Sequence, residues 1–165
     1  MSLEDIIKKH EKAIYTAAYA AGAAGIPGAF IPTLDITVVG GAWATMTVSI
    51  ANKSGRKLDK DTAFKLCSTI LAGGAAYIGG TKILTYLFHM IPGLGTMGAV
   101  GINSLLNFLY TFRMGRFIAM QMEKADFNTE DFASMIPEIT AMVFAMPSMA
   151  EIRQTWTDYN DHKRY

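Results

Sequence analysis

Charged residues are scarce in this sequence. Asp, Glu, Lys and Arg make up 18% of its 165 residues, whereas a soluble domain carries about 25%. Hydrophobic residues make up 51%. Because so little polar surface is available, we expect the chain to bury much of its surface against itself, a second copy, a partner protein or a membrane.

The sequence also lacks a surplus of one charge and a second cysteine. Its net charge is +1, so no basic field attracts nucleic acid, and we expect no nucleic-acid partner. Cys67 is the single cysteine and lies in an apolar run, which is typical of a small core residue. The chain starts with acidic Glu4 and Asp5 rather than a basic segment, so we expect no cleaved signal and a location on the cytoplasmic side.

Motifs of the common nucleotide and metal sites are missing. No G-x-x-x-x-G-K-[ST] occurs, which excludes a P-loop in this chain. Residues 93–98 match G-x-G-x-x-G, but the preceding segment favours a helix rather than the strand that a dinucleotide site requires. His10, His89 and His162 are far apart, so zinc is not expected, and we expect His10 to be exposed. We therefore predict no cofactor, no metal and no enzymatic activity.

Strand-like alternation of apolar and polar residues is absent as well. The pattern predicts one all-α domain over 1–165, a helical bundle of two apolar helical hairpins over 13–124 followed by short amphipathic helices and a polar tail over 125–165. The polar segment 53–65 is expected to be a solvated loop. The helices are expected to begin near Leu3, Asp35, Thr62, Thr96, Asn128 and Ser148.

Capping residues mark several of these helix starts. Ser2 with Asp5 and Ser148 with Glu151 have the spacing of a capping box. Asp59 or Asp61 is expected to cap the helix that follows the polar loop. Breaks between helices are expected at Pro27, Pro32, Gly55, Pro92 and Gly93.

Glycines lie inside the predicted helix from about Thr62 to Met90, as the pairs Gly73-Gly74 and Gly79-Gly80. Each costs roughly 1 kcal/mol relative to alanine in a helix interior, so we expect another backbone to pack closely there. Small residues also recur at four-residue steps, which suits membrane bundles and tight soluble cores alike. The two stripes are Ala17, Ala21, Gly25 and Ala72, Ala76, Gly80.

Long uncharged runs are present, but none is a clean membrane span. A spanning helix needs about 20 consecutive apolar residues. The run 13–34 is broken by Gly and Pro, the run 36–51 is short, and the run 66–113 is interrupted by Lys82, His89 and Pro92. Hairpins embedded in a membrane and a very apolar soluble bundle both stay open.

Candidate interaction residues follow from polar groups in apolar surroundings. Asp35 is the one acid between Glu11 and Asp59. We interpret it as a helix cap after Pro32; the alternative is catalysis or ion passage together with Lys82 and His89.

A polar row occupies the predicted helix from about Thr96 to Lys124, and two arginines follow it. Asn103, Asn107, Tyr110 and Thr111 lie on or near one helix face, where we expect hydrogen bonds between helices. Arg113 and Arg116 are expected to lie at the helix end and to meet helix carbonyls, acidic lipid, a partner's carboxylates or solvent.

Several of these segments resemble, in this order, a known family. They are Ile-Pro-Gly-Ala-Phe-Ile-Pro-Thr-Leu-Asp (26–35), Met-Ile-Pro-Gly-Leu-Gly (90–95) and Asn-Phe-Leu-Tyr-Thr-Phe-Arg-Met-Gly-Arg (107–116). The order resembles the uncharacterised hydrophobic helical domain that bacteria place after a small GTPase domain, and it is similar to the helical domain of the immunity-related GTPases. The resemblance covers 13–124. It implies a helical module that works beside a GTPase, often at a membrane. Because this sequence does not contain the GTPase part, we expect the module either to act with a GTPase in trans or to have an independent scaffolding role.

We therefore expect a non-enzymatic, membrane-associated helical module on the cytoplasmic side that self-associates as a homo-oligomer or acts with a GTPase in trans. The alternative is a soluble helical scaffold or partner-binding subunit with a very apolar core. Residues expected to matter for structure or interaction are Pro32, Asp35, Pro92, Gly93, Asn103, Asn107, Tyr110, Arg113 and Arg116.

Overall fold

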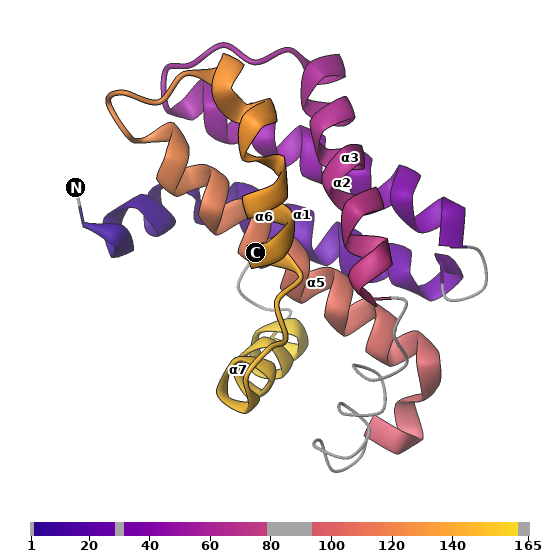
Figure 1. Cartoon of the computed structure of the whole chain (residues 1–165). Helices are drawn as coiled ribbons and strands as arrows, with labels where there is room; N and C mark the ends of the chain where they lie inside the picture. The colour runs from indigo at the N-terminus through magenta and orange to yellow at the C-terminus, as the bar shows by residue number, and fades with distance from the viewer. Residues whose placement is uncertain (1, 29–31, 79–93, 162–165) are drawn as a thin grey trace.

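Helices account for every regular element of the part of the chain that the structure describes (Figure 1). The structure, a computed structural model, describes residues 2–28, 32–78 and 94–161, with side chains for all of these except 25–28, 32–36, 75–78, 94–100 and 102. The predicted all-α helical bundle is thereby confirmed. Its elements are α1 (Leu3–Gly28), α2 (Pro32–Lys53), α3 (Lys60–Ile78), α5 (Leu94–Met122), the 3₁₀ helix η1 (Thr129–Met135), α6 (Ile136–Val143) and α7 (Met149–Asn160).

The predicted caps are confirmed at several helix starts. At α1, the Asp5 backbone N–H donates to Ser2 Oγ at 3.1 Å, and the Ser2 backbone N–H donates to Asp5 Oδ2 at 3.1 Å. Ser148 Oγ accepts the Glu151 N–H at α7. At α3, Asp59 rather than Asp61 is the cap, since its Oδ1 accepts the Thr62 N–H at 2.8 Å. Short local patterns therefore fix these helix starts.

Other boundaries differ from the prediction. The second helix starts at Pro32 rather than after a cap at Asp35, so Asp35 lies inside α2. Proline suits the first helical position, where a backbone N–H has no partner within the helix. Pro27 falls within α1 instead of breaking it. The predicted loop 53–65 is shorter, because α3 already begins at Lys60; Gly55 with φ of +73° ends the turn after α2, as expected.

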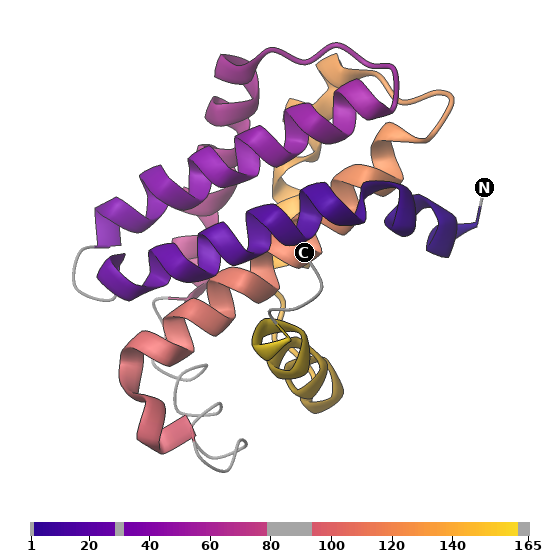
Figure 2. The same ribbon diagram turned by 180° about the vertical axis from the view of Figure 1, so that it is seen from behind.

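Helix α1 packs between α2 on one side and α5 on the other (Figure 2). Contacts between α1 and α5 pair Gly22 with Ser104, Ile14 with Gly115 and His10 with Glu123, so these two helices run antiparallel. Trp43 meets Thr111 and Met46 meets Gly115, so α2 runs parallel to α5. Farther along the chain, α3 packs against α2 and α6, whereas α7 packs against α5.

One core joins all of these helices. Its largest fully buried side chains include Trp43, Phe108, Phe132 and Ile14. Burying such a side chain contributes about 1.5–3 kcal/mol. Cys67 is also buried, and burial raises the pKa of its thiol to about 12. The expected behaviour of Cys67 as a small core residue is confirmed.

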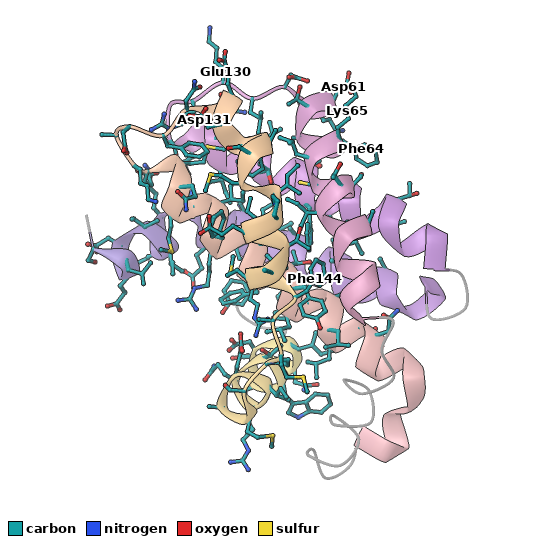
Figure 3. All side chains as sticks on the ribbon, viewed as in Figure 1. Asp61, Phe64, Lys65, Glu130, Asp131 and Phe144 are labelled. Carbon is teal, nitrogen blue, oxygen red and sulfur yellow. The ribbon has the colours of Figure 1, made fainter. Side chains whose placement is uncertain are left out.

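Two glycines allow unusually close packing. A Cβ at Gly74 would lie 2.0 Å from Cε2 of Phe144, whose ring points from the end of α6 toward α3 (Figure 3). A Cβ at Gly115 would lie 2.8 Å from Met46 Sδ. Close packing is found at Gly73-Gly74, but side chains of Thr140 and Phe144 make the contacts, so the prediction that another backbone packs there was wrong. Gly79-Gly80 lies outside the described residues.

Candidate functional site

Charge is distributed unevenly along the bundle. The segments 13–28, 32–52, 66–78 and 94–112 contain a single charged residue, Asp35. Because α1 runs antiparallel to α5, which is parallel to α2, the uncharged halves of α1 and α5 lie at the same end, beside the N-terminal half of α2, whose one charged residue is Asp35 (Figures 1 and 2). We call this the uncharged end. Helix α7, which carries Glu151, Arg153 and Asp158, lies beside it against α5.

The helices of the described segments are nevertheless not membrane spans. None of them combines the length and the hydropathy that a crossing requires.

The opposite end holds an ion cluster around His10. Lys9 Nζ and His10 Nε2 lie 2.6 and 2.8 Å from the same oxygen, Glu123 Oε1. Ser54 Oγ donates to that oxygen as well, at 2.7 Å. His10 is 1% exposed, so the prediction of an exposed histidine was wrong. The cluster joins α1, the end of α2 and the end of α5.

Burial and hydrogen bonding set the charge states in this cluster. Burial lowers the pKa of His10 below its usual range, although the hydrogen bond to Glu123 acts in the opposite direction. Burial also acts to raise the pKa of Glu123, but hydrogen bonds from Lys9, Ser54 and His10 outweigh it and lower the value to about 2. The stable arrangement at neutral pH is therefore an ionised Glu123 beside a neutral His10.

This cluster does not have the geometry of a serine nucleophile. In a catalytic triad the hydroxyl and the acid meet different ring nitrogens of the histidine. Here Ser54 and Glu123 both face Nε2, at 3.4 and 2.8 Å, while His10 Nδ1 is buried without a hydrogen-bond partner. The arrangement instead ties three helix segments together.

The predicted polar row on α5 is only partly used for contacts between helices. Thr111 Oγ1 accepts a hydrogen bond from Trp43 Nε1 of α2 at 2.6 Å, as expected. Asn107 Nδ2 and the Tyr110 hydroxyl are buried without a hydrogen-bond partner, and burial raises the pKa of Tyr110 to about 12. The Tyr110 ring packs against Phe144 with centroids 4.9 Å apart. Asn103 is half-buried on the same helix.

Arg113 has an internal partner. Its Nε and Nη2 donate to the two carboxylate oxygens of Glu151 at 2.7 and 2.6 Å, and its Nη1 donates to the carbonyls of Val143 and Ala145. One guanidinium thus holds the end of α6 and the start of α7 on α5. The predicted contacts with carbonyls and a carboxylate are found, but within this chain. The prediction that Arg113 and Arg116 lie at a helix end was wrong, because α5 continues to Met122.

The seam between α1 and α5 is lined by aromatic rings and opens into a groove. Tyr15, Tyr19 and Phe108 stack edge-on or tilted along it, with centroids 5.1–6.3 Å apart. Farther toward the N-terminus of α1, a groove of about 660 Å³ lies beside Phe112 and Arg116. Arg116 is exposed, and its guanidinium lies 5.8 Å from the centroid of the Phe112 ring. The full lining is Leu3, Glu4, Ile7, Lys8, Glu11, Phe112 and Arg116.

Several predicted residues fall where the structure gives no side chain. Pro92 and Gly93 lie outside the described residues, as do Lys82 and His89. Pro32 and Asp35 are placed only as part of the α2 backbone. Their predicted roles in interaction therefore stay predictions. Of the small-residue stripes, Ala17 and Ala21 are buried, whereas Ala72 is exposed on α3.

Sequence reasoning missed the cluster of Lys9, His10, Ser54 and Glu123. A signal for His10 was present, because it falls in the series Ile7, His10, Ile14, Ala17, Ala21, which has the three- and four-residue steps of a buried helix face. No local pattern points to Ser54 or Glu123, which lie 44 and 113 residues from His10. They meet it only through the packing of three helices.

Among the described residues, no group of three His, Cys, Asp or Glu side chains is arranged to hold a metal ion. No protein-family model, curated protein or solved structure matches this chain.

Proposed function

We propose that this protein is a non-enzymatic helical module that associates with membranes by dipping the uncharged end of its bundle into one face of the bilayer. The observation that carries the proposal is the position of the charges. The uncharged halves of the antiparallel helices α1 and α5 lie at one end, where Asp35 is the one charged residue in the adjoining half of α2, and the Lys9–His10–Glu123 cluster lies at the other end.

A bilayer is the environment that best suits such an end. Charged side chains cost about 2.5–3.5 kcal/mol each at the centre of a membrane helix, so a segment without them enters apolar surroundings at little cost. The segments 13–28 and 94–112 lack any charge over 16 and 19 residues. Shallow insertion also fits the absence of a spanning helix in the described part of the chain.

Vesicle flotation tests the proposal. The full chain is incubated with phosphatidylcholine vesicles and floated through a density gradient at low and high salt. We expect the protein to float with the vesicles, and salt to have little effect, because burial of apolar surface rather than charge drives the association. A protein that stays at the bottom of the gradient would contradict the proposal.

Two exposed apolar side chains give a matched pair of variants. Val38 is 43% exposed near the start of α2, at the uncharged end, and Leu3 is 47% exposed at the start of α1, at the other end. We expect Val38→Glu to weaken vesicle binding by about fivefold or more, since even 1 kcal/mol corresponds to roughly that factor. Leu3→Glu should leave vesicle binding unchanged. Equal losses for both variants would show that the orientation is wrong.

We also propose self-association and a GTPase domain acting in trans. The exposed Ala23 of α1 and the half-buried Gly41 of α2 support the first, because small side chains at these positions leave room for another helix to approach. The resemblance of 26–35, 90–95 and 107–116 to the GTPase-linked helical domain supports the second. Sedimentation velocity on vesicle-free protein tests the first. A GTPase domain encoded beside this chain tests the second: its hydrolysis rate should change when the chain is added.

A further inference from the structure

The seam between α1 and α5 already binds one helix, namely α7 of the same chain. The Tyr159 ring of α7 packs edge-on against Phe108 with centroids 5.5 Å apart. It fits a notch at Gly22, where a Cβ would lie only 3.0 Å from Tyr159 Cε2. The Tyr19 hydroxyl donates to the Asp158 carbonyl at 2.7 Å. An aromatic anchor in a notch and hydrogen bonds from the seam thus hold a short helix.

An arginine of α5 completes that binding site. Two nitrogens of Arg113 donate hydrogen bonds to the Glu151 carboxylate, at 2.6 and 2.7 Å. Helix α7 buries few of its own residues, chiefly Ile152 and Thr155. Its position therefore depends strongly on the Tyr159 anchor and on the pairing of a glutamate with an α5 arginine.

The same seam continues beyond Phe112 with a similar lining, but no helix of the described part of the chain lies in it. The floor is apolar, with Ile7 and Phe112 half-buried and Leu3 47% exposed. Arg116 lies one helical turn beyond Arg113 and is exposed. The groove therefore repeats the aromatic floor and the arginine that hold α7.

We propose that this groove binds an amphipathic helix of a partner protein, which inserts an apolar or aromatic side chain over Ile7 and Phe112 and pairs a carboxylate with Arg116. The proposal rests on the continuity of the groove with the α7 seam and is independent of the membrane function.

The charges around the groove favour a helix over a uniformly charged partner. Glu4, Lys8 and Glu11 alternate in sign along α1, and Arg116 balances the second acid. The lining thus has no net charge, so neither an anionic membrane nor nucleic acid gains from it. A partner helix with alternating charges on its flanks complements this pattern. The part of α1 that lines the groove spans residues 3–11. This is about 12 Å at 1.5 Å per residue, which matches roughly two turns of a partner helix.

A peptide with the sequence of residues 147–161 is the probe, because the seam is seen to bind that helix. The peptide is helix-stabilised, labelled with fluorescein and titrated with the full chain while anisotropy is recorded. We expect saturable binding that Arg116→Glu and Leu3→Glu each weaken at least tenfold. Val38→Glu, at the uncharged end, serves as the control and should bind the peptide like the wild type.

The location of the bound peptide is read from amide chemical shifts in the same titration. The proposal predicts shifts around Ile7, Phe112 and Arg116. Shifts confined to Gly22 and Ser104, with binding that strengthens in Arg113→Gln, would show that the peptide only replaces the chain's own α7 and would overturn the proposal. Absence of saturable binding would overturn it too, as would an Arg116→Glu variant that turns an oligomer into a monomer, because a second copy would then fill the groove.

Failure of this proposal is distinguishable from failure of the membrane function. Leu3→Glu is expected to affect peptide binding but not vesicle binding, and Val38→Glu is expected to do the reverse.

Discussion

His10 Nε2 and Glu123 Oε1 lie 2.8 Å apart, and they join the first turns of the chain to the end of its longest described helix. The contact is almost fully buried on the histidine side, where the side chain has 0% exposure. Lys9 and Ser54 share the same carboxylate oxygen. This cluster lies at the end opposite to the uncharged halves of α1 and α5.

Acid should destabilise this contact in two pH windows. The pKa of His10 is lowered from its ordinary 6.5, so the unfolded chain binds a proton at this site more readily than the folded chain, and stability falls as the pH drops below about 6.5. The pKa of Glu123 is lowered from 4.5 to about 2, so its contribution is complete above pH 4.5 and is lost between 4.5 and about 2. Urea unfolding at a series of pH values measures both.

His10→Gln isolates the first window. The variant keeps a donor near Glu123 but does not titrate, so the decline of stability between pH 6.5 and 4.5 should flatten while the decline below pH 4.5 persists. An unchanged slope above pH 4.5 would mean that His10 is not buried in its neutral form.

Replacing two helix glycines by alanine should have opposite effects. Gly74→Ala places a methyl group 2.0 Å from the Phe144 ring and should destabilise the protein by about 1–3 kcal/mol. Gly41→Ala meets nothing within 4 Å and should stabilise α2 by about 0.5–1 kcal/mol. Chemical denaturation of both variants gives the comparison. Similar destabilisation by both would contradict the packing of α6 on α3.

Thr111→Val tests the buried hydrogen bond between α5 and α2. The substitution keeps the shape of the side chain but leaves Trp43 Nε1 without its acceptor at 2.6 Å. We expect a loss of about 1–3 kcal/mol, the cost of an unsatisfied buried donor. Thr45→Val is the control, because Thr45 is exposed and bonds only to the Gly41 carbonyl of its own helix. A difference of less than about 0.5 kcal/mol between the two variants would contradict the burial of Trp43.

Local sequence signals predicted the fold class and most helix starts. Ser2, Asp59 and Ser148 act within three residues of their partners, so spacing alone reveals them. The start of α2 was misjudged because Asp35 and Pro32 both suit a helix start, and the proline at the first position prevailed.

Contacts across the bundle could not be predicted in the same way. Arg113 follows the polar row on α5, and nothing near it in the sequence indicates that its carboxylate is Glu151, 38 residues later. Likewise, no sequence pattern near Phe144 indicates that its ring packs beside Gly74. The shared oxygen of Glu123 and the groove beside Phe112 also depend on helix order and crossing, which composition and periodicity leave open.

The most direct test of the central claim is vesicle flotation of the wild type, Val38→Glu and Leu3→Glu side by side. The uncharged end should bind phosphatidylcholine vesicles. The wild type and Leu3→Glu should therefore float to the same extent, and Val38→Glu should bind the vesicles at least about fivefold more weakly. A wild-type protein that does not float, or a Val38→Glu variant that floats as well as Leu3→Glu, would contradict the claim that the uncharged end is the membrane-binding end.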